Sequence, residues 1–424
     1  MRAYERLLRY AKIYTESDPA SESHPSSANQ FDLARILEGE LKELGAGKTE
    51  LTEQCLVYGW FEATRGREED ETVGFIAHMD TAPDFQGKEV RPLMHENYSG
   101  EALPLGTSGR VLDPEVFPEL KKLKGRTLIT SDGTTLLGAD DKAGIAEILT
   151  MLERLKNEDL PHGRIAVCFT PDEEVGKGTD CFDIQKFGAA YAYTVDGGEE
   201  GEVVYENFNA ASAKVFFEGV NVHTGSAYGV MVNACRLAME FLGRMPQTEV
   251  PEKTRNYEGF FHLGEMQGDV ERATLSFLIR DHDRVKFEER KALLQSLAES
   301  MNEELGRLFV KVEITDSYFN MKEKIEPVFH VVERAFKATR NAGIEPITSP
   351  IRGGTDGARL SYAGLPTPNL GTGGYAFHGP FEHITAEGMD IVTEILVSVA
   401  TLKRNGTKRK TKRKNGRMEE RKEK

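Results

Sequence analysis

Residues 136–174 read LLGADDKAGIAEILTMLERLKNEDLPHGRIAVCFTPDEE, and this stretch indicates the fold class. A short apolar run ends at Leu137, and a well-formed helical pattern begins near Asp140 and Asp141. The apolar run RIAVCFT (residues 164–170) follows and predicts a buried strand that ends at an acidic turn. A helix followed by a buried strand, with charged residues at the junctions, is typical of a layered α/β domain.

The same arrangement recurs on both sides of this stretch. The run ETVGFIAHMD (residues 71–80) predicts a buried strand that delivers His78 and Asp80 at its end, and AYAYTVDGG (residues 190–198) predicts another that ends at Asp196. Loops at the carboxyl ends of strands are where α/β folds place their chemistry. Further helical patterns cover residues 2–14, 30–45, 326–341 and 385–402.

The pattern changes near Asn209. Residues 210–320 read as strand, helix, two strands, helix and strand, which is the order of a ferredoxin-like split βαβ unit. We therefore expect a discontinuous catalytic domain, residues 1–208 and 321–402, with an inserted α+β domain at residues 209–320. Residues 84–127 are rich in proline and glycine, and long ordered loops of this kind are usually functional.

Charge and hydropathy limit the classes of function. The net charge is −15, although residues 403–424 hold twelve Lys or Arg against three Glu, so the rest of the chain is strongly acidic. An acidic body argues against a nucleic-acid-binding surface. We expect the basic tail to be disordered and solvated, with a weak contact to RNA or another polyanion as the alternative. No apolar run approaches the roughly 18 residues of a membrane span, and the amino terminus lacks a signal-peptide core, so we expect a cytoplasmic protein.

Five short segments together hold what a paired-metal hydrolase site needs. Each is weak by itself: a histidine at a strand end is usually structural, a pair of aspartates can cap a helix, and adjacent glutamates often form a solvated turn. Four of the five nevertheless lie at the end of a predicted strand or the start of a predicted helix, which makes coincidence a poor explanation. The segments are His78-Met79-Asp80, Gly138-Ala139-Asp140-Asp141, Asp172-Glu173-Glu174, Val195-Asp196-Gly197 and His378-Gly379-Pro380-Phe381-Glu382.

Histidine and carboxylate ligands without cysteine suit zinc, cobalt or manganese in a hydrolytic site. In a strand, His78 and Asp80 point the same way, so Asp80 can accept the second imidazole N–H of His78. Of the adjacent glutamates, one can bind metal and the other can act as base. The four cysteines show no CxxC spacing and are expected to be free thiols.

These motifs resemble the peptidase T family of tripeptide aminopeptidases, within the larger group of di-zinc aminoacylases and carboxypeptidases. The resemblance runs from residue 1 to about 402. It rests on GFIAHMDTAPD, LITSDGTTLLGADDKAGIAEI, FTPDEEVGKGTD, YTVDGGEEGEVVYENFNAA, HTGSAYGVMVNA and IRGGTDGARLSYAGLPTPNLGTGGYAFHGPFEH. It implies a zinc-exopeptidase catalytic domain, an inserted lid and dimerisation domain, a homodimer, and tripeptides as substrate.

The resemblance also implies a role for each candidate residue. One metal would be held by His78, Asp140 and Asp196, and the other by Asp140, Glu174 and His378, with Asp140 bridging. Asp80 would orient His78, and Glu173 would be the general base. His223 would stabilise the oxyanion, in some relatives across a dimer, although Thr224 stands where a proline is usual. His383 is an alternative ligand to His378.

Two arginines are candidates for substrate binding, and several other reactions could use the same metal residues. Arg280 and Arg352 are the candidates for gripping a substrate carboxylate, because a guanidinium can do so with two hydrogen bonds. A carboxypeptidase, a dipeptidase or an N-acyl amino acid deacylase would use the same metal residues. A binding protein that has kept the fold and lost the reaction is a further alternative, which the intact Glu173 disfavours.

Overall fold

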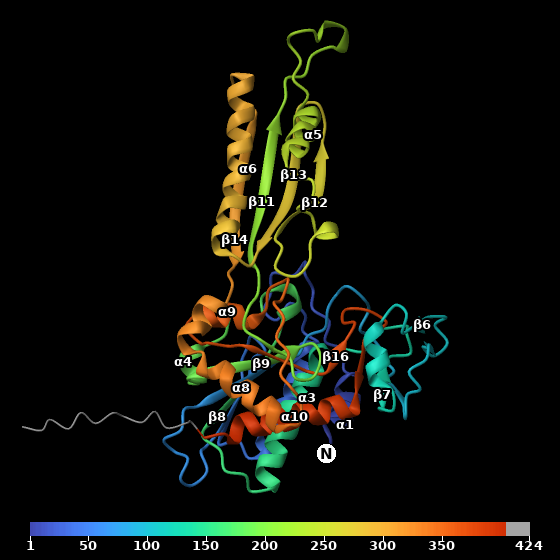
Figure 1. Ribbon diagram of the computed structural model, residues 1–424, viewed down its shortest axis with the longest axis vertical. Helices are drawn as coiled ribbons and strands as arrows, with labels where there is room; N and C mark the ends of the chain where they lie inside the picture. The colour runs from blue at the N-terminus through green and yellow to red at the C-terminus, as the bar shows by residue number, and fades with distance from the viewer. Residues whose placement is uncertain (404–424) are drawn as a thin grey trace, which may run out of the picture.

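A computed structural model describes residues 1–403, and its body is built on one seven-stranded mixed sheet (Figure 1). The three central strands run parallel and are buried along most of their length, as expected for strands covered on both faces. In spatial order the strands are β1 (Lys48–Leu51), β2 (Val57–Phe61), β8 (Ile165–Thr170), β3 (Val73–His78), β9 (Tyr191–Gly197), β15 (Asn369–Gly371) and β10 (Val203–Val204).

Helices cover both faces of this sheet. A large apolar core lies between one face and the helices α1 (Ala3–Tyr10), α2 (Gln30–Leu44), α3 (Ala139–Asn157), α8 (His330–Asn341) and α10 (Ala386–Thr401). A smaller core on the other face involves α4 (Ile184–Phe187) and α9 (Asp356–Tyr362). The α/β class expected from the sequence is confirmed. In the described residues 1–403, none of the helices combines the length and apolar character that crossing a membrane requires.

The helix predicted over 326–341 begins later than expected. Residues 326–328 form a 3-10 turn (Glu326–Val328) after the short helix α7 (Lys322–Ile325), and α8 begins only at His330. Pro327 lies in the turn and has no N–H to donate, so a continuous helix cannot pass through this position.

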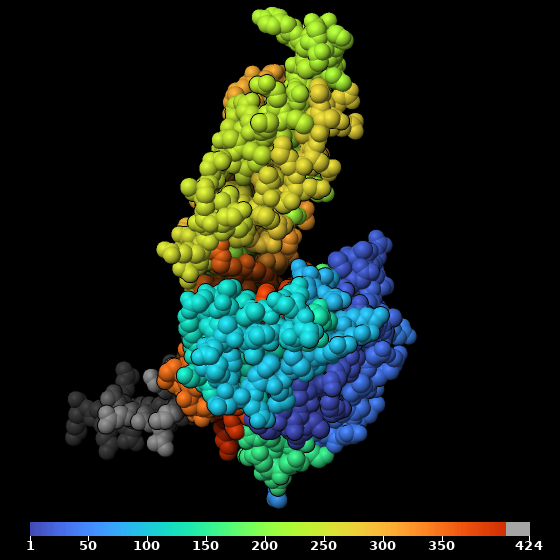
Figure 2. All heavy atoms as spheres, turned by 90° about the vertical axis from the view of Figure 1, so that its right-hand side faces the viewer, coloured from blue at the N-terminus to red at the C-terminus, as the bar shows by residue number. Residues whose placement is uncertain are grey.

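Residues 84–127, expected to be mostly loop, contribute to a small packed layer together with residues 128–130 and 374–385. Four strands pair in the order β16 (Gly374–Tyr375), β17 (His383–Thr385), β7 (Leu128–Thr130) and β4 (Leu93–His95), and a hairpin joins β5 (Leu103–Pro104) to β6 (Val111–Leu112). A separate apolar cluster supports them: Tyr98, Leu105, Leu112, Leu120, Leu123 and Leu128. This layer lies on one flank of the body, in cyan in Figure 2.

Residues 209–320 project from the body, and we call them the protruding unit (Figures 1 and 2). Its four antiparallel strands lie in the order β12 (Phe260–Gly268), β13 (Arg272–Asp281), β11 (Asn209–Glu218) and β14 (Val310–Tyr318). Helices α5 (Ala234–Arg244) and α6 (Arg284–Leu305) pack on the sheet through a core separate from that of the body. Along the chain, the elements follow the strand and helix order expected from the sequence.

Both helices begin at capping residues and not where the apolar pattern starts. The Asn233 side chain accepts a hydrogen bond from the N–H of Arg236, and the Asp283 side chain accepts from Val285 and Lys286. Helix α5 therefore begins at Ala234 and α6 at Arg284.

Candidate metal centre

His78 ends the central strand β3 and is almost fully buried. Its Nε2 lies 3.0 Å from Oδ1 of Asp140 and 3.4 Å from Oδ1 of Asp196. Its Nδ1 lies 3.3 Å from Oδ1 of Asp80. The imidazole thus lies between two carboxylates on one side and a third behind it.

Asp140 lies between the two histidines. While its Oδ1 faces His78, its Oδ2 lies 3.3 Å from Nε2 of His378. Nε2 of His378 is also 3.1 Å from Oε2 of Glu174. A carboxylate whose two oxygens face two different imidazoles has the geometry of a bridging ligand.

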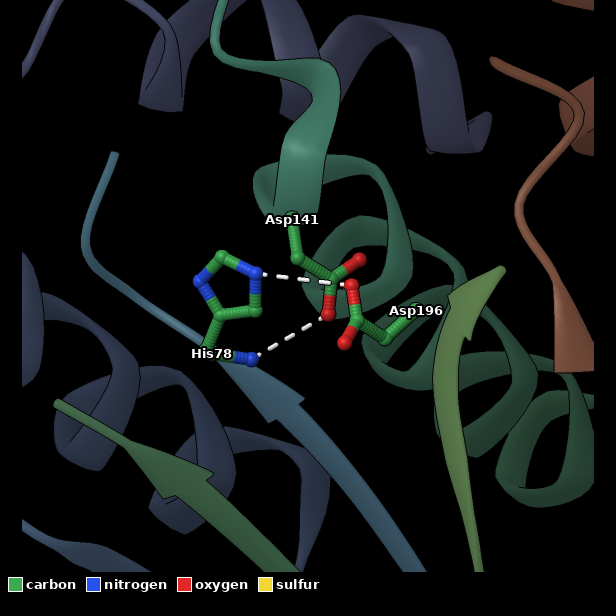
Figure 3. Close-up of side chains that lie close together, drawn as sticks. All are labelled: His78, Asp141 and Asp196. Carbon is green, nitrogen blue, oxygen red and sulfur yellow. Dashed lines mark hydrogen bonds and ion pairs between the residues drawn. The ribbon is translucent and has the colours of Figure 1, made fainter. Parts of the chain in front are cut away.

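Asp141 also lies beside His78 and Asp196, although its carboxylate has other partners. Its Oδ2 accepts a hydrogen bond from the backbone N–H of His78 at 3.1 Å, and its Oδ1 accepts from Gly144 at 3.2 Å. Figure 3 shows this carboxylate beside Asp196 and His78. His78, Asp141 and Asp196 lie close enough together to hold an ion, as do His78, Asp140 and Glu174. Because backbone amides occupy both oxygens of Asp141, Asp140 is the better bridging candidate.

Glu173 lies at the turn after β8, where Asp80 holds the backbone. The two oxygens of Asp80 accept hydrogen bonds from the N–H groups of Glu173 at 3.0 Å and Glu174 at 3.1 Å. Asp80 therefore connects the His78 ring to the turn that carries both glutamates. Burial, followed by the nearby charges of Asp356 and Asp196, raises the pKa of Glu173 well above its ordinary value.

The whole cluster is electrostatically strained. Burial raises the pKa of Glu174 to about 7 and that of Asp196 to about 6. Hydrogen bonds with Asp140 and Glu174 raise the pKa of His378 to about 11. Several carboxylates buried around two imidazoles make an anionic site, which favours a divalent cation.

The donor set fits such a cation. Oε1 of Glu174 is buried and lacks a hydrogen-bond partner among the described residues, so a ligand position is free on this side chain. Imidazole nitrogens and carboxylate oxygens from Asp140, Glu174, Asp196, His78 and His378 match the chemistry of zinc, cobalt or manganese. Two ions could share Asp140.

His383, the alternative ligand, lies away from the cluster. It is fully buried, its Nδ1 lies 2.8 Å from the carbonyl oxygen of Phe381, and its ring stacks on Tyr375. The structure thus brings His378 to the carboxylates and uses His383 in the packing of the flanking layer.

Two buried carboxylates near the cluster have no role among the expectations from the sequence. Glu382 accepts hydrogen bonds from the N–H groups of Leu137, Gly138 and Asp140 at 2.7–2.9 Å, so it fixes the start of α3. Asp356 is buried beside Glu173, and burial raises its pKa to about 7. Glu382 lies within the segment 378–382 that the sequence singled out, but only the fold reveals that it binds a loop more than 240 residues earlier.

The candidate arginines lie at the base of the protruding unit. The Arg280 guanidinium makes one hydrogen bond within the described residues, to the carbonyl of Ile279, and stacks on Tyr318. The Glu173 charge contributes to the raised pKa of Tyr318, for which burial is the main cause, so this ring lies near the cluster.

Arg352 is held more tightly. Its Nη1 donates to the carbonyls of Asn256 and Glu258 at 2.9 Å, and its Nη2 donates to the carbonyl and hydroxyl of Thr254. Rings of Phe208 and Phe260 lie against the guanidinium. In this structure Arg352 therefore connects the body to a loop of the protruding unit.

His223 is not part of the cluster in this chain. It is exposed, and its Nδ1 accepts a hydrogen bond from Gly225 at 3.1 Å. The segment 219–233 that carries it follows β11 and forms the end of the protruding unit away from the body (Figure 1). The sequence could not indicate this distance.

Comparison with known proteins agrees with this geometry. Residues 132–402 match the model of peptidase family M20/M25/M40. Peptidase T from Alkaliphilus oremlandii is 50% identical over 401 residues, which cover 94% of this chain and 98% of the relative. Peptidase T from Clostridium perfringens is 51% identical over 399 residues, with the same coverage.

A solved structure has the same fold. The aminopeptidase PepT of Bacillus cereus superposes with a TM-score of 0.75 at 24% identity, covering 94% of this chain and 97% of the other. The 50% and 51% identity to the two Peptidase T relatives confirms the resemblance expected from the sequence. The chain belongs to peptidase family M20/M25/M40 and, within it, to the peptidase T proteins.

Proposed function

We propose that this protein is a di-metal aminopeptidase that removes the amino-terminal residue from tripeptides. The observation that carries the proposal is the position of Asp140 between His78 and His378, with Asp196 and Glu174 completing the two sets. Peptidase T relatives of similar length and about 50% identity support the tripeptide substrate. Zinc is the first choice of metal, with cobalt or manganese as alternatives.

Each side chain then has a defined task. Metal ions bound by these residues supply Lewis acidity and a nucleophilic water at neutral pH. Glu173 takes the proton of the attacking water and delivers it to the leaving amine. Asp80 fixes the His78 ring and the glutamate turn together.

Residues 209–320 would act as a lid and dimerisation domain. Arg280 and Arg352 would bind the far carboxylate of the tripeptide. This contact would select substrates of tripeptide length and orient the first peptide bond. For Arg352 this requires the contacts with Thr254, Asn256 and Glu258 to be exchanged for the substrate.

His223 would stabilise the oxyanion from a second copy of the chain. Its exposed position at the far end of the protruding unit is compatible with a contribution to a neighbouring molecule and not to its own cluster. A homodimer is therefore part of the proposal.

Hydrolysis of Met-Gly-Gly, with the products separated, tests the function. The protein is compared as purified, stripped with chelator and restored with zinc, and N-acetyl-Met-Gly-Gly is the blocked substrate. We expect free methionine and intact Gly-Gly from the unblocked peptide only. This activity should be lost with chelator and regained with zinc. Release of the carboxyl-terminal glycine would indicate a carboxypeptidase, and cleavage of the acetyl group a deacylase.

A pair of variants ties the reaction to the site. Glu173→Gln should lower kcat by about 10²–10⁴-fold while metal content is kept. Glu62→Gln makes the same change at a largely exposed position and should leave kcat unchanged. Full activity of Glu173→Gln would remove this residue from the mechanism.

A further inference from the structure

Residues 15–30 lead into the first residue of α2 and are attached to two segments next to the candidate metal centre, and we call them the strap. The N–H of Thr81, which directly follows Asp80, donates to the carbonyl of Thr15 at 3.2 Å, and the N–H of Ser17 donates to the carbonyl of Thr81 at 3.2 Å. Glu16 and Thr81 thus form a short parallel bridge. The strap is therefore attached beside the end of β3.

The second attachment is at Asp172, which directly precedes Glu173. Its carboxylate is fully buried and accepts hydrogen bonds from the N–H of Ser26 at 2.7 Å, the hydroxyl of Ser26, and Nε2 of Gln30 at 2.7 Å. In return, Oε1 of Gln30 accepts a hydrogen bond from the N–H of Asp172 at 3.2 Å. Gln30 thus binds both the side chain and the backbone of this aspartate.

Asp172 needs such support. Its φ of 59° lies in the left-handed region, which a residue other than glycine adopts only when its surroundings hold it there. The conformation of Asp172 sets the direction in which the chain enters Glu173 and Glu174. Asp80 holds the N–H groups of these two glutamates from the other side.

We propose that Gln30 and Ser26 are positioning residues that act through Asp172 to hold the general base Glu173. This inference rests on the proposed function, in which Glu173 moves the proton. Catalytic groups must be held within a fraction of an ångström, and a displacement of about 1 Å can cost about 10²-fold in rate. The strap therefore contributes to kcat although it lies outside the metal ligands.

Gln30→Met tests the proposal, because methionine has a similar length and no hydrogen-bonding groups. With Met-Gly-Gly as substrate, well below the thermal midpoint, we expect kcat to fall between about 10-fold and 10²-fold. KM and zinc content should stay unchanged. Ser26→Ala should lower kcat less, and Ser26→Thr, which keeps the hydroxyl, should restore most of it. Gln295→Met makes the same substitution at an exposed position of α6 and should leave kcat unchanged.

Combination with Glu173→Gln separates positioning from a general structural role. If Gln30 acts through Glu173, adding Gln30→Met to Glu173→Gln should cause no further loss of kcat. The inference would be overturned if the kcat losses of the two single variants multiplied in the double variant. It would also be overturned if Gln30→Met left kcat unchanged or lowered the zinc content. If Glu173→Gln itself keeps full activity, the proposed function fails instead, so the two failures can be told apart.

Discussion

The carboxyl-end edge of the body's sheet and the protruding unit differ in how they place their candidate residues. At the sheet edge, His78, Asp140 and His378 come from positions up to 300 residues apart, and each histidine nitrogen lies within 3.3 Å of the same carboxylate. In the protruding unit, strands of nine or ten residues and two capped helices follow the sequence pattern closely. Its candidate, His223, is exposed on the segment 219–233, which forms the end of the protruding unit away from the body.

This difference shows what each region depends on. The body buries charged groups against one another, so its site exists only when several distant segments are held together. The protruding unit has its own apolar core and carries its functional loop at an exposed end. Variants at the metal ligands of the body should therefore affect metal binding and chemistry together, whereas variants in the protruding unit should separate them.

The largest expected effect is that of Asp140→Asn. An amide cannot supply two anionic oxygens to two ions, so we expect zinc content to fall and tripeptide hydrolysis to be lost. Metal analysis after desalting, together with the rate on Met-Gly-Gly, measures both. Asp390→Asn, at a partly exposed aspartate of α10, is the control. Full zinc content with full activity in Asp140→Asn would rule out a bridging role.

His223→Ala should keep its metal and lose activity. Removal of one oxyanion donor costs about 10²–10³-fold in kcat. Mixing this variant with Glu173→Gln should restore partial activity, because one site of a mixed dimer then has an intact Glu173 and an intact His223. If the mixture stays inactive although mixed dimers form, His223 does not act across the dimer.

Gly144→Ala should disturb the candidate metal centre by displacing residues that neighbour its ligands. A Cβ at this position of α3 would overlap the carbonyl oxygen of Val195 and the carboxylate of Asp141. Val195 directly precedes Asp196, so we expect a loss of about 1–3 kcal/mol in the free energy of unfolding together with weaker zinc binding. Thermal unfolding and zinc titration measure the two effects.

Gly243→Ala is the matched change in the protruding unit. Gly243 is exposed within α5, and a Cβ there would meet no atom within 4 Å. We expect the free energy of unfolding to rise by about 0.5–1 kcal/mol, because alanine loses less chain entropy on folding than glycine. Zinc binding should stay unchanged. Equal effects of the two substitutions would contradict the contrast between the regions.

The smallest expected effect is a pH dependence of stability due to Glu147. This residue of α3 is fully buried without a hydrogen-bond partner among the described residues, and burial, followed by the Glu200 charge, raises its pKa well above 4.5. The folded protein therefore keeps a proton that the unfolded chain loses. Its contribution to stability is complete below about pH 4.5 and declines as pH rises toward the folded pKa.

Glu147→Gln should remove this contribution. Because glutamine does not titrate, the free energy of unfolding of the variant should increase relative to that of the parent as pH rises from 5 to 8. Chemical unfolding of both proteins at the two pH values measures the difference. A difference between them that does not change with pH would show that Glu147 has an ordinary pKa.

Much of the fold could be predicted because its signals are local. Buried strands such as RIAVCFT and the helix after Asp140 have an apolar pattern that the structure preserves. Residues 84–127 could not be predicted, since a cluster formed by single leucines scattered through proline-rich sequence has no periodicity. Of the expected basic tail, residues 403–424, all but Lys403 lie outside the described residues, so the expectation of disorder stays a prediction.

The sequence by itself determined the α/β class, the strand and helix order of residues 209–320, and the residue types of a metal centre, because periodicity and ligand chemistry are written in neighbouring residues. Only the tertiary structure decided that His378 and not His383 meets Asp140, that Asp141 binds backbone amides, and that Gln30 reaches Asp172. These choices depend on distances between segments far apart in the chain. Such distances follow from packing and burial of the whole protein, which no short stretch of sequence contains.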